Sequence, residues 1–173
     1  MKFINIIKVL YFKLISANKV AKILGVKYGK NCSFGTKKFD SEPYLITVGD
    51  NFRTSSDVTF ITHDGSVHVL RNIYDTYKEI DLFGPIDIGN NVFIGLGATI
   101  LPNTRIGNNV IVGAGSLVRG TLKDNSVYAG VPIRFICSIE EYEAKHKEQF
   151  VHSKYMEPDA KEKYIRDLYS ERF

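Results

Sequence analysis

Two of the four histidines, His63 and His68, lie close together in the string TFITHDGSVHVLR and are the side chains best suited to proton transfer. Asp64 and Gly65 follow His63 and are typical of a turn, so we expect the His63 imidazole to project outward from a corner. An imidazole in such a position can act as a general base near neutral pH. Asp64 could orient its neighbour or bind an amine substrate, and His68 could hydrogen-bond within its loop, contact a substrate or have no role.

Both histidines stand at the start of a polar interruption, residues 64–81, within an otherwise regular chain. A loop of that length in a regular scaffold is more often functional than accidental. It carries Arg71, Tyr74 and Tyr77, and aromatic faces stack on sugar rings and drug-like molecules alike. We therefore predict that this loop contacts a substrate or ligand.

The elements that must position these residues repeat every six residues. An aliphatic side chain recurs in register, usually followed directly by glycine, and the fourth position after it is small or apolar. The aliphatic positions are Ile88, Ile94, Ile100, Ile106, Val112 and Val118. This period is typical of a parallel β-helix, in which each hexad forms one short strand and a corner. We expect both sets of side chains to point inward, and the glycines to supply backbone angles that a Cβ would penalise.

The segments before and after the repeats of this mainly β chain lack the six-residue period. Residues 1–25 are predicted as an amphipathic helix, residues 26–136 as the β-helix domain with its excursion near 64–81, and residues 137–173 as a helical tail. Apolar residues on one face of the first helix suit packing on the open end of the β-helix or on a neighbouring subunit, or contact with a membrane surface. In the tail, Ser138 and Glu141 have capping-box spacing.

Composition narrows the classes of function. The 173 residues suffice for one domain, and the net charge of +4 lacks the concentrated basic stripe of a nucleic-acid-binding protein. Of the two cysteines, Cys32 falls at an inward position, so a free thiol and a reducing cytoplasm are expected. Lysines interrupt the apolar N-terminal run, which argues against a signal peptide or a membrane span.

The closing string GAGSLVRGTLKDNSVYAGVPIRFI, the hexad run and His63 beside a loop together resemble the hexapeptide-repeat acyltransferases. That family has a left-handed β-helix and includes maltose, galactoside and streptogramin acetyltransferases and many capsule or lipopolysaccharide O-acetyltransferases. The resemblance covers residues 28–136. It implies a homotrimer with acetyl-CoA in clefts between adjacent subunits, and it favours His63 over His68 as the base. In such an enzyme the loop that carries Arg71, Tyr74 and Tyr77 is expected to shape the choice of the acceptor of the acyl group.

Cofactor contacts also follow from the resemblance. It places Ala114 of the GAGS string against the pantetheine arm of acetyl-CoA, with Leu96 one coil earlier on the same face. Arg119 and Arg134 are the candidates for the phosphates of coenzyme A, since an arginine fork matches phosphate geometry. No metal is expected.

The function implied is transfer of an acetyl group from acetyl-CoA to a hydroxyl of a sugar or surface-polysaccharide precursor, in the cytoplasm or at the inner face of the membrane. N-acetylation of an amino sugar and inactivation of an antibiotic stay open. The five-residue separation of His63 and His68 also matches two zinc ligands of γ-class carbonic anhydrases, although a third ligand is missing. A noncatalytic β-helix scaffold is the remaining alternative.

Overall fold

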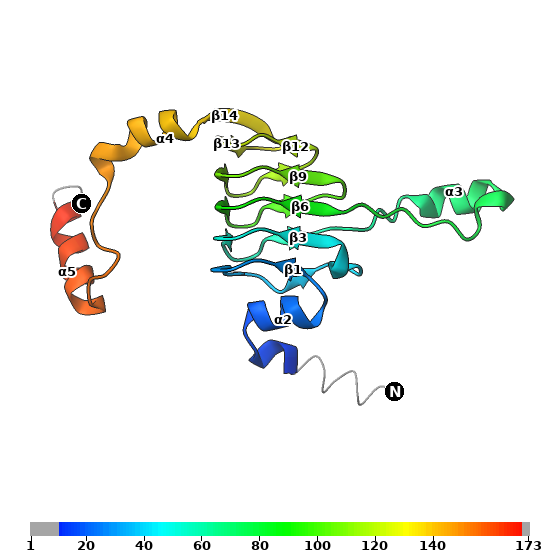
Figure 1. Ribbon diagram of the computed structural model, residues 1–173, viewed down its shortest axis with the longest axis horizontal. Helices are drawn as coiled ribbons and strands as arrows, with labels where there is room; N and C mark the ends of the chain where they lie inside the picture. Colours follow the sequence, from blue (N-terminus) through cyan, green and yellow to red (C-terminus); the bar gives the residue numbers. More distant parts are fainter. Residues whose placement is uncertain (1–10, 171–173) are drawn as a thin grey trace. The chain divides into compact units, whose positions relative to one another are not determined.

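The computed structural model describes residues 11–170. The chain divides into two compact units, Met1–Tyr142 and Glu143–Phe173. The first unit is a parallel β-helix whose successive coils stack along one axis (Figure 1). Predicted helical residues before Tyr11 lie outside the described part of the chain.

Three sheets form the walls of the β-helix. The first contains β1 (Lys27–Tyr28), β3 (Ile46–Val48), β6 (Ile86–Ile88), β9 (Thr104–Ile106) and β12 (Thr121–Leu122). The second contains β4 (Arg53–Thr54), β7 (Val92–Ile94), β10 (Val110–Val112), β13 (Ser126–Ala129) and β14 (Arg134–Ser138). The third contains β2 (Lys38–Phe39), β5 (Thr59–Phe60), β8 (Thr99–Ile100) and β11 (Leu117–Val118). Their strands pair in parallel, except that β14 turns back antiparallel on β13.

The predicted inward positions are confirmed. All six leading aliphatic residues from Ile88 to Val118 are at most 5% exposed. The residues four positions after them are buried as well: Val92, Ala98, Thr104, Val110, Ser116 and Leu122. Because each coil repeats the last, like side chains stack along the axis and form one continuous core.

The role predicted for the hexad glycines is wrong in its physical reason. A Cβ on Gly95 would lie 2.5 Å from the backbone nitrogen of Ala114 in the next coil, so glycine is needed for close approach between coils. The left-handed backbone conformation occurs two residues later instead, as at Asn91 (φ 55°) and Gly97 (φ 66°). Asparagine tolerates that conformation better than most side chains, which explains its recurrence at these corners.

The N-terminal end of the β-helix is covered by helix. Residues 11–14 are helical, and α2 (Ala17–Ile23) follows after Ser16, whose hydroxyl accepts from the Lys19 amide as an N-cap. Ala21 of α2 is fully buried in the core cluster. For the described residues, packing on the open end of the β-helix is therefore confirmed.

Two segments interrupt the coils. Residues 36–45 include β2 and a short 3₁₀ helix, η1 (Pro43–Leu45). The excursion at 64–81 is not featureless either: it holds α3 (Val67–Ile73) and the 3₁₀ helix η2 (Asp75–Tyr77), and it projects from the β-helix (Figure 1).

Helix α4 (Ile139–His146) follows β14. The predicted capping box is confirmed, since the Ser138 amide donates to Glu141 Oε2 and the Glu141 amide donates to Ser138 Oγ. The second unit contains η3 (Lys147–Gln149) and α5 (Pro158–Tyr169). Among the residues described, no helix is both long and apolar enough to cross a bilayer.

Candidate active site

The His63 backbone is fixed at the neck of the excursion. His63 forms an antiparallel bridge with Phe83, and the Asp64 amide donates to the Leu82 carbonyl over 2.8 Å. From the other side, Asp40 Oδ2 accepts from the His63 amide at 3.1 Å. The excursion therefore begins and ends at one small ladder that is tied to the preceding coil, and this holds His63 in place.

The His63 imidazole packs beside Phe83, with ring centroids 5.2 Å apart. Its Nε2 is buried without a hydrogen-bond partner and lies 3.9 Å from Asp81 Oδ1. Asp81 in turn forms a salt bridge with the guanidinium of Arg71. Arg71 Nε also donates to the Ile80 carbonyl over 2.7 Å. Arg71 thus fixes the Asp81 carboxylate beside the His63 imidazole.

Asp81 was not predicted from the sequence. It lies at the far end of the excursion from His63, in a polar stretch with no motif, and only the closure of the excursion brings the two together. The same contacts show where the predicted acceptor residue Arg71 lies: its guanidinium reaches back from α3 to the returning segment. No sequence signal distinguished that inward role from contact with an acceptor.

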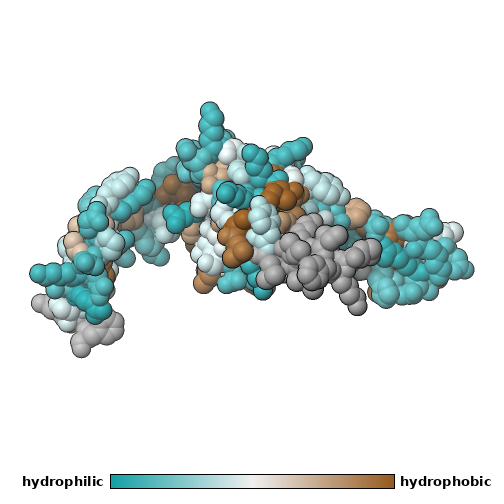
Figure 2. Space-filling view, turned by 90° about the horizontal axis from the view of Figure 1, so that it is seen from below, coloured by the Kyte–Doolittle hydropathy of each residue, from teal (hydrophilic) through white to brown (hydrophobic). Residues whose placement is uncertain are grey.

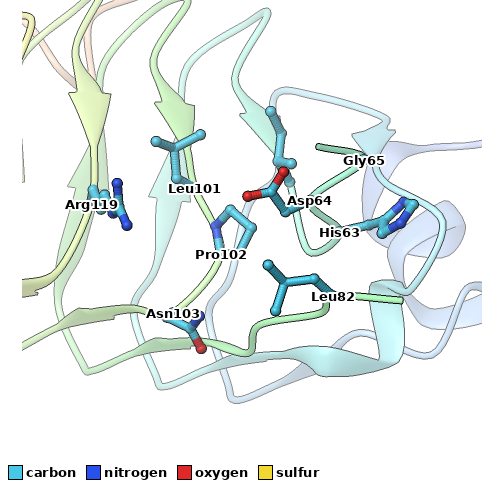
Figure 3. A pocket seen from close by; sticks show the side chains of 9 residues that line it. His63, Asp64, Gly65, Leu82, Leu101, Pro102, Asn103 and Arg119 are labelled. Carbon is cyan, nitrogen blue, oxygen red and sulfur yellow. The ribbon is translucent and has the colours of Figure 1, made fainter. Parts of the chain in front are cut away.

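A cavity of about 290 Å³ opens beside His63 where the corners after β5, β8 and β11 stack (Figure 3). Its lining residues are Ile61, His63, Asp64, Gly65, Leu82, Leu101, Pro102, Asn103 and Arg119. In the view of Figure 3, Asp64 lies between His63 and Arg119. The stacking of corners thus brings residues 63, 64 and 119 to one cavity, and the His63 imidazole is directed away from Asp64 and Arg119 (Figure 3).

Asp64 provides a fixed negative charge in this cavity. Hydrogen bonds from the Ser66 side chain and backbone amide are the main reason that the pKa of Asp64 lies below its usual value, with smaller contributions from His63 and Arg119. The Ser66 amide donates to Asp64 Oδ1 over 2.9 Å. Asp64 is therefore both the turn-forming residue and an ionised group next to His63.

The predicted cofactor residues divide between two edges of the β-helix. Leu96 and Ala114 occupy successive corners between the second and third sheets, where the Gly115 amide donates to the Leu96 carbonyl over 2.7 Å. Arg134 belongs to the same region, because it pairs with Ala129 at the next corner along. Arg119 lies instead at the His63 edge, in the cavity.

The remaining predicted residues lie on the excursion and do not line the cavity. His68 is exposed on α3, and its Nε2 is 3.1 Å from the side-chain nitrogen Nδ2 of Asn72. Tyr74 and Tyr77 are exposed and pack edge to face, with centroids 5.5 Å apart. Across the described residues, no cluster of three or more His, Cys, Asp or Glu side chains is arranged to hold a metal ion.

Comparison with known proteins decides the family. Residues 85–120 match the family "Bacterial transferase hexapeptide (six repeats)". The chain is 43% identical to "Protein CapG" of Staphylococcus aureus over 171 residues, 95% of this chain and 97% of that protein. It belongs to the hexapeptide-repeat transferase family. The predicted fold class, a left-handed parallel β-helix with helices at both ends, is confirmed.

Two named acetyltransferases are also similar to this chain. The chain is 35% identical to the galactoside O-acetyltransferase of Escherichia coli K12 over 121 residues, which are 66% of this chain and 57% of that enzyme. Among solved structures, a maltose O-acetyltransferase from Clostridium difficile 630 superposes with a TM-score of 0.51 and 25% identity, covering 70% of this chain and 83% of that one. The predicted enzyme class, acetyltransferase, is thereby confirmed.

Proposed function

We propose that this protein transfers the acetyl group of acetyl-CoA to a hydroxyl of a sugar or surface-polysaccharide precursor, with His63 as general base. The observation that carries the proposal is the setting of His63. Its backbone is fixed at the neck of the excursion, its Nε2 faces Asp81, and a cavity with further ionisable groups opens beside it. Membership in a family with named sugar O-acetyltransferases supplies the reaction class.

The reaction follows from these positions. His63 accepts the proton of the acceptor hydroxyl as its oxygen attacks the thioester carbonyl carbon. The carbon–sulfur bond then breaks, and the imidazolium returns the proton to the departing thiolate. Asp81, 3.9 Å from Nε2, stabilises the imidazolium while it exists. The acceptor oxygen attacks the thioester directly, so no covalent enzyme intermediate is required, and the base ends the cycle in its starting protonation state.

The acceptor is proposed to enter the cavity between Asp64 and Arg119. Its volume of about 290 Å³ is at the small end for ligand sites, which suits one sugar ring better than an oligosaccharide. Asp64 can accept from sugar hydroxyls and Arg119 can donate to sugar oxygens. Tyr74 and Tyr77, exposed on the excursion, offer aromatic faces for the rest of a larger acceptor.

The division of site residues between two edges supports a homotrimer. Leu96, Ala114 and Arg134 are proposed to hold acetyl-CoA, yet His63 stands at a different edge of the same β-helix. Apposing the His63 edge of one subunit to the Leu96 edge of the next would complete the site, and a closed ring of three satisfies every such edge. Light scattering should then give three times the chain mass of 19.6 kDa.

Release of free thiol from acetyl-CoA, measured against a panel of monosaccharides, nucleotide sugars and amino sugars, tests the reaction. Acetyl transfer by wild type and a loss of about 10²-fold or more in His63→Ala are expected. Equal turnover by both proteins would overturn the role of His63. Product mass after mild base distinguishes O-acetyl from N-acetyl transfer, since only the ester is cleaved.

A mixing experiment tests whether the site is shared. His63→Ala and Ala114→Trp, each purified inactive, are unfolded together and reassembled. If each site takes His63 from one subunit and Ala114 from its neighbour, random reassembly restores about a quarter of wild-type activity. No recovery, with trimers formed, would place both residues in one subunit's site.

A further inference from the structure

Charge is distributed very unevenly along this chain. Between Met1 and Phe39 every charged side chain is a lysine. All 19 acidic side chains lie from Asp40 onward, where they outnumber the lysines and arginines, so that part is net negative although the whole chain is +4. A wholly basic segment joined to a net-negative remainder gives the chain a directional field, which attracts an anionic surface to the basic end.

The basic segment covers one end of the β-helix. Helix α2 lies below β1, the terminal strand of the first sheet (Figure 1). The exposed lysines of this end are Lys13, Lys19, Lys22, Lys27 and Lys30. Within residues 11–170, none of these five forms a salt bridge with an acidic side chain. Lys37 and Lys38 are engaged, the former with the Phe12 and Lys13 carbonyls and the latter with Asp57.

Apolar side chains accompany these lysines. Leu14 is 85% exposed, Ile23 53% and Tyr11 50%. On α2, Lys19, Lys22 and Ile23 fall three or four residues apart and share the face opposite to the buried Ala21. Figure 2 views this end of the unit and shows hydrophobic surface directly beside hydrophilic surface.

We propose that this basic end docks on the surface of an anionic lipid bilayer. Lysines near such a surface are drawn to its negative headgroups, while exposed leucine, isoleucine and tyrosine side chains can enter the interface. A nucleic acid would satisfy the lysines alone and leave Leu14 and Ile23 in water, and a second copy of the chain would oppose lysine to lysine. The bilayer is the one partner that complements both kinds of side chain.

Sedimentation of the full chain with vesicles tests this proposal. Vesicles of two parts phosphatidylcholine to one part phosphatidylglycerol are compared with phosphatidylcholine alone, at low and high salt. Binding only to the anionic vesicles, weakened by salt, is expected. Each lysine at an anionic surface is worth about fivefold in affinity, so Lys19→Glu with Lys22→Glu should weaken binding at least about 30-fold.

The matched control is Lys161→Glu with Lys163→Glu on α5, which changes net charge equally and should keep wild-type binding. Leu14→Ser should weaken binding several-fold without changing its salt dependence. Equal binding to neutral vesicles, or equal loss in both charge-reversed pairs, would overturn the proposal, as would binding of DNA tighter than of anionic vesicles. None of these residues lines the His63 cavity, so thiol release with a small acceptor should stay unchanged in every variant.

Discussion

Replacing Asp81 by asparagine removes a charge from the His63 site while keeping the shape of the side chain. In the resting site His63 must be neutral to accept a proton, and it becomes positive only as the hydroxyl is deprotonated. The attraction from Asp81 is therefore strongest in the transition state. Its loss should lower kcat and leave the KM values for both substrates within about twofold.

The size of the effect follows from the 3.9 Å between His63 Nε2 and Asp81 Oδ1. Two unit charges at that distance interact by about 4 kcal/mol at an effective dielectric constant of 20 and by about 1 kcal/mol in bulk water. The two side chains are 32% and 48% exposed, so screening brings the value toward the lower limit. A loss of about 1–2 kcal/mol corresponds to a fall in kcat of about 5–30-fold.

Steady-state thiol release gives kcat and KM for Asp81→Asn, Asp81→Glu and a control, Asp75→Asn. Asp75 lies on the same excursion, is almost fully exposed and pairs with Lys78 rather than with the site. Asp81→Glu should recover part of kcat, and Asp75→Asn should match wild type. The reasoning is refuted if Asp81→Asn keeps its kcat, or if KM rises while kcat is unchanged. Thermal unfolding of each variant separates these outcomes from a loosened excursion.

Three further predictions concern stability. Gly95→Ala should destabilise the fold by about 1–3 kcal/mol, because its Cβ meets the next coil's backbone, whereas Gly65→Ala, with open space around it, should be nearly neutral in thermal unfolding. Ionised Asp64 stabilises the native state, since its folded pKa lies below 3.8; the Tm advantage of wild type over Asp64→Asn should hold at pH 6 and shrink as pH falls below that value. Ser138→Ala should cost about 1 kcal/mol locally and speed hydrogen exchange at the start of α4.

The β-helix could be predicted from the sequence because its buried positions repeat every six residues. Each hexad buries its leading aliphatic residue and the residue four positions later, so six consecutive hexads give the same evidence for the fold. Corners stack for the same reason, and this brings residues as far apart as His63 and Arg119 to one cavity. The sequence had instead grouped Arg119 with Arg134, as a contact for the phosphates of coenzyme A. Leu96 and Ala114 stack likewise at the second edge.

The parts that the sequence did not predict are those where periodicity stops. The pairing of His63 with Asp81 depends on how the excursion closes, and no repeat constrains that closure. The glycine positions were recognised but explained wrongly, since contact with the next coil cannot be read from one hexad. The cofactor role carried over by resemblance to Arg134 stays a prediction until ligand binding is measured, whereas Arg119 is now proposed to contact the acceptor.

We expect the excursion to link acceptor binding to the proposed base, His63. Arg71 on α3 holds both the Ile80 carbonyl and the Asp81 carboxylate, and Asp81 is the charged group facing His63. A displacement of α3 by an acceptor would therefore change how firmly Asp81 is held beside the imidazole. Arg71→Lys, which keeps the charge but loses the fork, should lower kcat for large acceptors that contact α3 more than for a monosaccharide. Equal losses for both would mean that Arg71 only stabilises the excursion.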